Sequence, residues 1–471
     1  MPLQKNQVLT LRVERLSSDG SGVAHSPDGE TVFIPGAAPG DEARVRIVKD
    51  CKRYAFGILD EVLTPSPDRI FLCCGEARDL GAFTTRRSYD VVFKRAKQEN
   101  VADAFARIGG LDVPVLPIVG SPEVNRYRNK VQFPVGVDKS GKPCIGFYAG
   151  RTHRIVPCPD CRLQPGVLNE IGNALCAFFA EKGIQPYSEE TGRGLVRHIF
   201  LRRGAHSGQI MVCLVCTRAK LPSAEELCTR LKAQFAEITT ILLNVNAKNT
   251  NVILGTETHT LYGPGYIEDT LCGVPVQLGP LSFYQVNTLA AEQLYGIAAQ
   301  YAQLTPDDLL LDLYCGMGTI GLSMAAHCRE LIGVEIVPEA IESAKANAAR
   351  MGADVAAKSR FFCADAGQAA TRLAAEGLHP DIVMLDPPRK GCDEATLSAV
   401  VRMAPRRVVY VSCNPATAAR DAAWLEQNGY HAEKVQPVDL FPRTRHCECV
   451  IALSKGEIDS KKVRVEFSLE G

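Results

Sequence analysis

Residues 309–328, LLLDLYCGMGTIGLSMAAHC, decide the fold. An apolar run is followed by a turn that contains Gly316 and Gly318, and Gly321 falls in the next apolar stretch. An unbroken run of branched apolar residues is typical of a buried strand, and glycines permit a tight turn into a helix. We therefore predict a strand, a glycine-rich loop and a helix, in that order.

The same alternation continues toward the C-terminus. ELIGVEIVPEAIESAKANAARMG (330–352) predicts a strand that ends at Glu335, followed by a helix. DIVMLDPPRKG (381–391) and RVVYVSCNPAT (407–417) predict later strands with polar ends. Strands that alternate with helices form a parallel sheet with helices on both faces. The fold class of this region is therefore α/β and Rossmann-like.

The residues before this α/β region show a different pattern. Short alternating runs separated by Gly, Pro, Asp and Ser predict a small β-barrel at the N-terminus, and a mixed α+β region follows it. We assign a β-barrel to residues 1–62, a central α+β domain to 63–275, the α/β domain to 276–456 and a charged tail to 457–471.

Two segments of these first domains interleave basic and aromatic residues. They are KDCKRYAFG (49–57), with Lys49, Lys52, Arg53, Tyr54 and Phe56, and NRYRNKVQF (125–133). Aromatic rings stack on bases while basic groups contact phosphates, so both segments suit RNA. An ordinary solvated β-hairpin explains the first segment equally well.

The composition narrows the class of protein. The 471 residues are 46% hydrophobic and 23% charged, which is typical of a globular protein. Lys plus Arg and Asp plus Glu both number 53, so RNA binding must rest on local patches. Eighteen cysteines without an export signal predict thiols in a reducing cytoplasm. We expect no membrane association, because no apolar run is long enough for a span, and we expect a monomer.

Polar residues at the predicted strand ends indicate a nucleotide-like cofactor. Gly316 and Gly318 let the backbone approach a ligand, and Glu335 can accept hydrogen bonds from ribose hydroxyls. Asp365, in FFCADAG (361–367), ends the next strand, where an adenine edge is often read. A glycine-rich loop, a first acid and a second acid follow one another in the same order in S-adenosylmethionine-dependent methyltransferases, and the sequence is similar to them in this respect. A dinucleotide fold is the competitor, because the loop also loosely fits G-x-G-x-x-G.

Asp386-Pro-Pro favours the methyltransferase. Two prolines fix a rigid backbone ledge beside a methyl donor, and Asp386 can orient a planar acceptor there. The alternative for Asp386 is a helix N-cap after a strand.

Cys413 follows the predicted strand 407–412, where it is either a buried thiol or a nucleophile. Methylation of carbon 5 of a pyrimidine is a reaction that needs such a nucleophile. Carbon 5 becomes nucleophilic only after a thiolate adds to carbon 6, and a base must then remove the carbon 5 proton. Thr444, His446, Glu448 and Val450 alternate, so in a strand all four face one side. We predict Glu448 as the base, with a buried salt-bridge partner of an arginine as the alternative.

Five motifs together resemble the RNA uracil-5-methyltransferase family in order and spacing. They are SFYQVNT (282–288), LDLYCGMGTIGL (311–322), LDPPRKG (385–391), YVSCNPATAARD (410–421) and FPRTRHCECV (441–450). The N-terminal domain resembles the TRAM barrel of the 23S ribosomal RNA members. The resemblance implies Cys413 as nucleophile, Glu448 as base and Asp386 near uracil and cofactor. The resemblance also implies that Gln285, Tyr314 and Glu335 contact S-adenosylmethionine. For Gln285 and Tyr314 this role rests on the resemblance alone.

The family pattern fails at one place. Many ribosomal members carry an iron-sulfur cluster with ligands spaced C-x5-C-G-G-C and a fourth cysteine downstream. Cys74 and Cys161 fit the first and last positions, but Leu80–Phe83 replaces C-G-G-C. Leu and Phe cannot bind iron, so we expect that the cluster has been lost and that no metal is bound. A site made by Cys73, Cys74, Cys158 and Cys161 is the alternative.

The sequence thus predicts methylation of carbon 5 of a uridine in RNA, with 23S ribosomal RNA as the expected target and transfer RNA as the runner-up. Two other readings stay open. A noncatalytic RNA-binding assembly factor would not need Cys413, and an amino-methyltransferase would need neither Cys413 nor Glu448.

Overall fold

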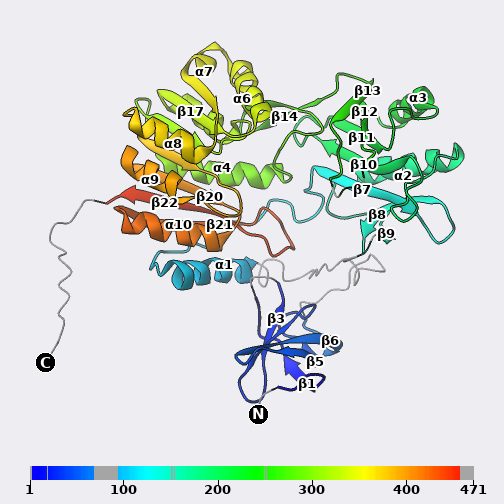
Figure 1. Cartoon of the computed structure of the whole chain (residues 1–471), viewed down its shortest axis with the longest axis horizontal. Coiled ribbons are helices and arrows are strands. Elements are labelled where there is room, and N and C mark those ends of the chain that lie inside the picture. Colours follow the sequence, from blue (N-terminus) through cyan, green and yellow to red (C-terminus); the bar gives the residue numbers. More distant parts are fainter. Residues whose placement is uncertain are drawn as a thin grey trace. The chain divides into compact units, whose positions relative to one another are not determined.

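The computed structural model describes residues 3–456 except 18–19, 68–93, 150–151, 153, 249 and 251. The chain divides into two compact units. Figure 1 labels their helices and strands and colours them along the sequence. The first unit contains Met1–Asn100, Ile118–Gln293 and Asp439–His446, and the second contains Val101–Pro117, Leu294–Val438 and Cys447–Gly471. The boundaries of the three domains assigned from the sequence stay predictions.

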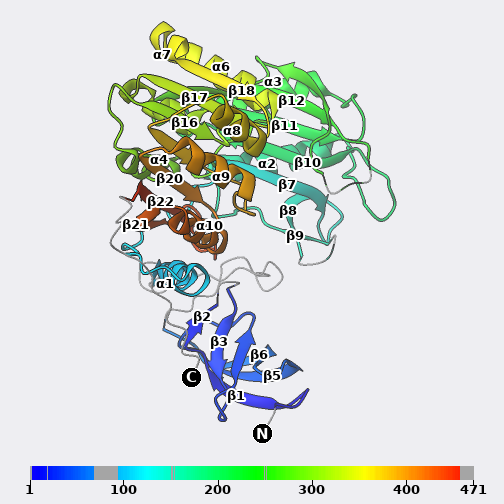
Figure 2. The same ribbon diagram turned by 60° about the vertical axis from the view of Figure 1, so that its left-hand side comes forward.

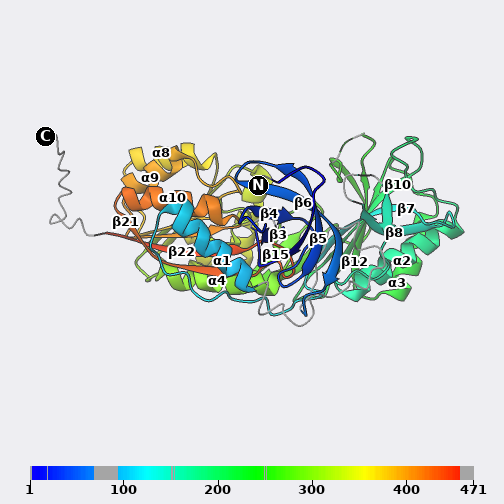
Figure 3. The ribbon, with the colours of Figure 1, turned by 90° about the horizontal axis from the view of Figure 1, so that it is seen from below.

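A six-stranded sheet forms at the N-terminus, in the order β1-β5-β6-β4-β3-β2. Its strands are β1 (Val8–Arg12), β2 (Arg15–Leu16), β3 (Gly22–His25), β4 (Thr31–Ile34), β5 (Glu42–Asp50) and β6 (Tyr54–Thr64). Residues alternate between a buried and an outward face along β5, as a barrel requires. Val32, Ile34, Val45 and Ile47 fill the interior. Figure 3 shows the curved strands β3 to β6 from below.

The central part of the first unit is a seven-stranded sheet in the order β13-β12-β11-β10-β7-β8-β9. Its strands are β7 (Lys130–Val137), β8 (Pro143–Tyr148), β9 (Ile155–Pro157), β10 (Val196–Arg203), β11 (Ile210–Cys216), β12 (Ile238–Val245) and β13 (Glu257–Tyr262). Helices α2 (Gly166–Glu181) and α3 (Ala224–Gln234) place apolar side chains in the same core as this sheet. A hairpin of β14 (Ile267–Leu271) and β15 (Val274–Leu278) follows.

The second unit is built on the α/β sheet predicted from the sequence, in the order β18-β17-β16-β19-β20-β22-β21. Its strands are β16 (Leu309–Leu313), β17 (Glu330–Glu335), β18 (Ser359–Cys363), β19 (Ile382–Leu385), β20 (Arg407–Ser412), β21 (Tyr430–Val438) and β22 (Glu448–Lys455). The strands from β18 to β20 are parallel, and β22 pairs antiparallel with β20 and with β21. The predicted sheet is confirmed, with an antiparallel pair of strands added at one edge.

Helices cover both faces of this sheet. Those of the second unit and its borders are α1 (Lys94–Asp103), α4 (Thr288–Ala302), α5 (Thr319–Met324), α6 (Pro338–Met351), α7 (Ala353–Lys358), α8 (Ala366–Ala375), α9 (Glu394–Met403) and α10 (Pro415–Gln427), with a π-helical turn at Ala104–Gly109 and a 3₁₀ turn at Ala325–His327. Helices α8, α9 and α10 lie side by side (Figure 2), and α4 lies on the other face (Figure 3). Within the described ranges, no helix has the length and apolar character that a membrane span requires.

Candidate active site

The carboxyl ends of the parallel strands bring most of the predicted site residues of the second unit to one edge of the sheet. The chain runs outward from β16 through β17 to β18 and then returns to β19 on the other side of β16. Ligands bind in α/β sheets at this point of reversal, outside the carboxyl ends of the strands. Tyr314, Glu335, Asp386 and Cys413 each end one of these strands or follow it directly.

The glycine-rich loop has the backbone that the sequence predicted. Tyr314, Gly316 and Gly318 have φ values of 65°, 55° and 78°, in the left-handed region that favours glycine, and α5 begins directly afterwards. A Cβ at Gly321 would lie 2.7 Å from Oδ2 of Asp312, so only glycine lets α5 approach β16 this closely. Asp312 is itself a residue that sequence reasoning missed. Burial raises its pKa to about 8, and its Oδ1 has no partner within the described residues.

Glu335 ends β17 and connects this loop to the second strand. Its Oε2 accepts a hydrogen bond from the amide of Gly316 at 3.1 Å, and its Oε1 accepts from the amides of Ile336 at 2.9 Å and Val337 at 3.0 Å. A carboxylate offers about four acceptor positions, so capacity for a ribose hydroxyl remains.

The loop and its surroundings fit S-adenosylmethionine. A Cβ built at Gly316 would meet nothing within 4 Å, so the backbone there is open to a ligand. Ile336 and Val337, next to Glu335, are 61% and 45% exposed and offer apolar surface for a flat base. We therefore expect residues 314–318 and Glu335 to hold this group.

Two other predicted cofactor residues have local roles that leave their assignment a prediction. Asp365 follows β18 and caps α8, where its Oδ1 accepts from the amide of Gln368 at 3.1 Å. Gln285 belongs to the first unit, where its backbone carbonyl accepts from Nδ2 of Asn129 at 2.8 Å.

Asp386 follows β19 and does not cap a helix. Helix α9 begins at Glu394, and its cap is Asp393, so the N-cap alternative is wrong. Desolvation by the surrounding protein raises the pKa of Asp386 to about 7. Such a carboxyl group is available in both protonation states near neutral pH.

Cys413 lies between β20 and α10, and its thiol is partly exposed. Burial raises the pKa of this thiol, and the nearby carboxylates of Glu448 and Asp386 raise it further. The guanidinium of Arg389 acts in the opposite direction, by its charge and by a hydrogen bond. The structure therefore brings the three predicted catalytic residues together. It adds Arg389, which the sequence analysis quoted in LDPPRKG without assigning it a role.

The backbone of Arg389 is held beside Cys413. Its carbonyl accepts from Nδ2 of Asn414 at 2.9 Å and from Oγ1 of Thr417 at 3.2 Å. The buried Asp421 carboxylate accepts hydrogen bonds from the hydroxyl of Tyr410 at 2.6 Å and from the amide of Cys392 at 2.8 Å. These bonds fix the loop that follows the two prolines.

Glu448 is buried at the start of β22. Ser412 pairs with Cys449 across the antiparallel β20–β22 ladder, so Glu448 lies opposite Cys413 where the ladder ends. The predicted alternation of four residues on one strand face is wrong, because β22 begins only at Glu448. Thr444 and His446 lie in the preceding turn, where Thr444 Oγ1 donates to the carbonyl of Phe441.

The proposed cluster cysteines are described only in part. Cys158 and Cys161 are buried, and a hydrogen bond from Cys158 lowers the pKa of Cys161 to about 7. Cys73, Cys74 and the Leu80–Phe83 segment lie outside the described residues. No group of three or more metal-ligating side chains occurs among those that are described. The loss of the cluster stays a prediction.

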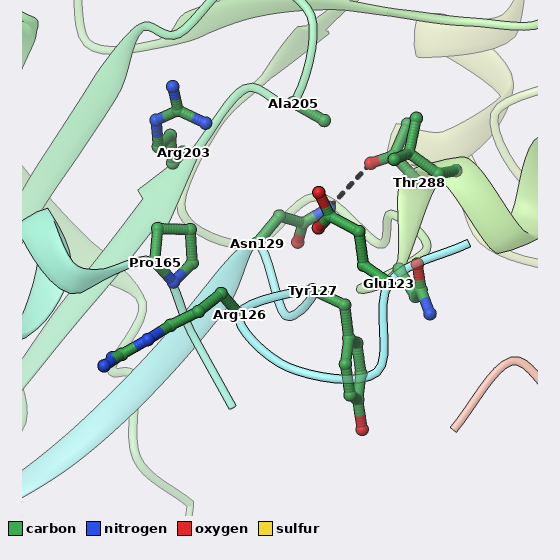
Figure 4. A pocket seen from close by; sticks show the side chains of 10 residues that line it. Glu123, Arg126, Tyr127, Asn129, Pro165, Arg203, Ala205 and Thr288 are labelled. Carbon is green, nitrogen blue, oxygen red and sulfur yellow. Dashed lines mark hydrogen bonds between the residues drawn. The ribbon is translucent and has the colours of Figure 1, made fainter. Parts of the chain in front are cut away.

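The second basic-aromatic segment, 125–133, surrounds the start of β7 in the first unit. Lys130 pairs with Arg202 across the β7–β10 ladder, and burial together with Arg202 and Arg128 lowers the pKa of Lys130 to about 8. On the neighbouring positions, Asn129 and Arg203 line a cavity of about 110 Å³ (Figure 4). Arg202 is buried, and its guanidinium donates to the carbonyls of Gly279 and Ser282, both at 2.8 Å.

The Rossmann-like sheet, the open glycine loop and the acid at the end of β17 define the class of protein, a methyltransferase that depends on S-adenosylmethionine. A model of the tRNA (Uracil-5-)-methyltransferase family matches residues 277–456, and a model of the TRAM domain matches residues 2–59.

Relatives of similar length agree with this class. Uncharacterized RNA methyltransferases of Oceanobacillus iheyensis and Halalkalibacterium halodurans are 40% and 42% identical, over 96% of this chain and 98% of each relative. The crystal structure of Pyrococcus abyssi tRNA (uracil-54, C5)-methyltransferase in complex with S-adenosyl-L-homocysteine is 25% identical, with a TM-score of 0.73 over 95% of this chain and all of that one. The chain therefore belongs to the RNA uracil-5-methyltransferase family and carries an N-terminal TRAM domain.

Proposed function

We propose that this chain methylates carbon 5 of a uridine in 23S ribosomal RNA, with Cys413 as a covalent nucleophile. The observation that carries this proposal is the convergence of Cys413, Glu448 and Asp386 at the carboxyl edge of the sheet. A buried carboxylate beside a partly exposed thiol suits a reaction that needs both a nucleophile and a base.

The first step is addition of the Cys413 thiolate to carbon 6 of the uracil ring. The new carbon–sulfur bond takes the electron pair of the thiolate, and the ring electrons move toward the carbonyl at carbon 4. Arg389 favours this step, because its charge and its hydrogen bond both stabilise the thiolate.

Carbon 5 then uses the electron pair of the enolate to form its bond to the methyl group, and the bond between that methyl group and the sulfonium sulfur would break, with S-adenosylhomocysteine as the leaving group. S-adenosylmethionine, when bound at residues 314–318 and Glu335, supplies an electrophilic methyl group. The partly exposed Asp386, fixed by the two following prolines, orients the ring against the loop.

Elimination completes the reaction. Glu448 removes the proton from carbon 5, the electron pair restores the double bond between carbons 5 and 6, and the Cys413 thiolate leaves. Burial of Glu448 suits this task, because a desolvated carboxylate is a stronger base than one in water.

The first unit supports RNA as the substrate. Arg128 and Lys130 are partly exposed at the start of β7, and no ion pair joins either of them to an acid within the described residues. Such cations bind phosphate oxygens without reading the base sequence.

The proposal of ribosomal RNA rests on the N-terminal TRAM domain, because the sequence resemblance to the ribosomal RNA members includes a barrel at this place. Transfer RNA is the second candidate. The description of the matching family model and the substrate of the Pyrococcus abyssi relative favour it.

Nucleoside analysis tests both parts of the proposal. Purified protein is incubated with S-adenosylmethionine and unmodified 23S ribosomal RNA or transfer RNA in separate reactions, with Cys413→Ala as control. We expect 5-methyluridine in the ribosomal RNA reaction and none with the variant. Product only in transfer RNA would replace the substrate. A methylated amine, or product formed by Cys413→Ala, would refute covalent catalysis.

A further inference from the structure

Arg389, the cation beside Cys413, is carried by a tight turn in the loop after β19. The amide of Gly391 donates to the carbonyl of Pro388 at 2.8 Å, and Gly391 has φ 79°, in the left-handed region that favours glycine. Arg389 itself is exposed. An exposed side chain has few packing contacts that fix it, so the place of this guanidinium depends on the backbone that carries it.

Two adjacent residues of α10 hold the backbone of this loop. The guanidinium of Arg420 donates to the carbonyls of Lys390 at 3.0 Å and Cys392 at 3.3 Å. Its Nε donates to Oδ1 of Asp421 at 2.8 Å, and the Asp421 side chain is only 1% exposed. Oδ2 of Asp421 accepts from the amide of Cys392 at 2.8 Å. A Cβ added to Gly391 would lie 2.5 Å from this oxygen, so the loop backbone lies directly against the carboxylate.

The same carboxylate also binds the strand that leads to the nucleophile. Oδ2 of Asp421 accepts from the hydroxyl of Tyr410 on β20 at 2.6 Å, and Tyr410 lies three residues before Cys413. One buried acid therefore connects the segment that ends at Cys413 with the segment that carries Arg389. The spacing between the thiol and its cation depends on this connection.

We propose that Asp421 and Arg420 are positioning residues for the reaction, which act by holding the Arg389 guanidinium beside the Cys413 thiol. Both act through Arg389 and not by touching the substrate, because Asp421 is buried and its two oxygens accept from protein donors. The inference rests on the proposed function only in taking Cys413 as the reacting thiol.

The charges around the thiol explain why the position of Arg389 matters. Glu448 of β22, Asp386 after β19 and Arg389 all act on Cys413, and among these three Arg389 is the cation. A loop that shifts away removes the cation and leaves the two carboxylates. Less of the thiol is then ionised at neutral pH, and the thiolate is the nucleophile.

The test follows alkylation of Cys413 by iodoacetamide in the full chain as a function of pH, measured by mass spectrometry. Asp421→Asn should lower the rate at pH 7 about 1.5- to 5-fold, the range for loss of one exposed ion pair, and should move the profile to higher pH. Direct electrostatics predicts the opposite sign, since removal of a negative charge favours a thiolate. A lower rate therefore identifies an effect that passes through the loop.

A double-variant cycle identifies Arg389 as the residue through which the effect passes. In the Arg389→Gln background, Asp421→Asn should cause no further loss, because the cation that it positions is already absent. Arg420 is half-exposed, so Arg420→Gln should fold, and it should show the same loss and the same dependence on Arg389. This variant decides the question if Asp421→Asn does not fold.

Arg407 supplies a matched control within the same sheet. It begins β20, at the opposite end of the strand from Cys413, and pairs with Glu433 at 3.1 Å. Arg407→Gln also removes an ion pair that holds β20, but it should leave the alkylation profile of Cys413 unchanged.

Three results would overturn the inference. They are unchanged or faster alkylation in Asp421→Asn, an undiminished loss in the Arg389→Gln background, and an equal shift in Arg407→Gln. Failure of the proposed function shows separately, because alkylation needs neither RNA nor S-adenosylmethionine. It would appear as absence of 5-methyluridine with the parent protein while the alkylation pattern persists.

Discussion

Replacement of Lys97 by Met should destabilise the first unit strongly. Lys97 lies on α1, and its Nζ is 2.6 Å from Oδ1 of Asp439, with the two side chains only 2% and 0% exposed. The same ammonium donates to the carbonyl of Phe441 at 3.0 Å. Loss of one partner of a buried pair leaves an uncompensated charge, which costs about 3–5 kcal/mol. For a unit of this size, that corresponds to a drop in the thermal midpoint of roughly 6–20 °C.

Differential scanning calorimetry measures this effect, and the same helix offers the control. Arg95 pairs with Glu99 at 2.8 Å, but their side chains are 76% and 53% exposed. Arg95→Met should therefore cost only about 0.3–0.5 kcal/mol. The double variant Lys97→Met, Asp439→Leu should recover much of the loss, because it also removes the buried carboxylate that Lys97 contacts. A loss of stability below about 1 kcal/mol in Lys97→Met would refute the reasoning.

Three further predictions concern the site and the RNA surface. The rate of Cys413 alkylation by iodoacetamide, measured by mass spectrometry, should rise at a higher pH than for an ordinary cysteine, because the pKa of Cys413 is raised. Arg389→Gln should move this pH–rate profile to still higher pH, and a shift to lower pH would contradict the role of Arg389. Glu448→Gln should retain thiol addition and methyl transfer but stall elimination, so a slowly migrating protein–RNA adduct should appear on a denaturing gel; its absence with RNA binding intact would exclude Glu448 as the base. Lys130→Gln should reduce the slope of log K for RNA binding against log salt by about 0.7, whereas the control Lys139→Gln, in an exposed turn, should leave it unchanged. The contribution of Lys130 to RNA affinity should fall as the pH rises through about 8, because Lys130 then loses its proton.

Local sequence was sufficient for the parallel sheet and its glycine-rich loop. The strand, the positive-φ glycines and the acid at Glu335 each follow from residues close in sequence, because a parallel sheet places every carboxyl strand end at one edge. The function of the family followed from the same motifs, since they lie at those strand ends.

Sequence reasoning failed, or gave no indication, where the environment of a side chain depends on a long-range contact. The alternation through Thr444 and His446 predicted a strand that does not begin until Glu448. Asp386 resembled a helix cap until the structure placed the cap at Asp393. The influence of Arg389 on Cys413 has no signal in its own segment, because it depends on how the loop after the two prolines is held by α10.

The sequence by itself therefore determined the class of fold, the order of the motifs and the residue types available for chemistry. Those properties depend on backbone preference and on apolar periodicity, which act over a few residues. Only the tertiary structure decided which of these side chains meet. Cys413 and Glu448 are brought together by the antiparallel β20–β22 ladder, and Phe33 joins Tyr54 and Phe56 by the parallel pairing of β4 with β6. Strand pairing is set by the burial of whole faces and not by any one segment, so such neighbours cannot be read from a single stretch of sequence.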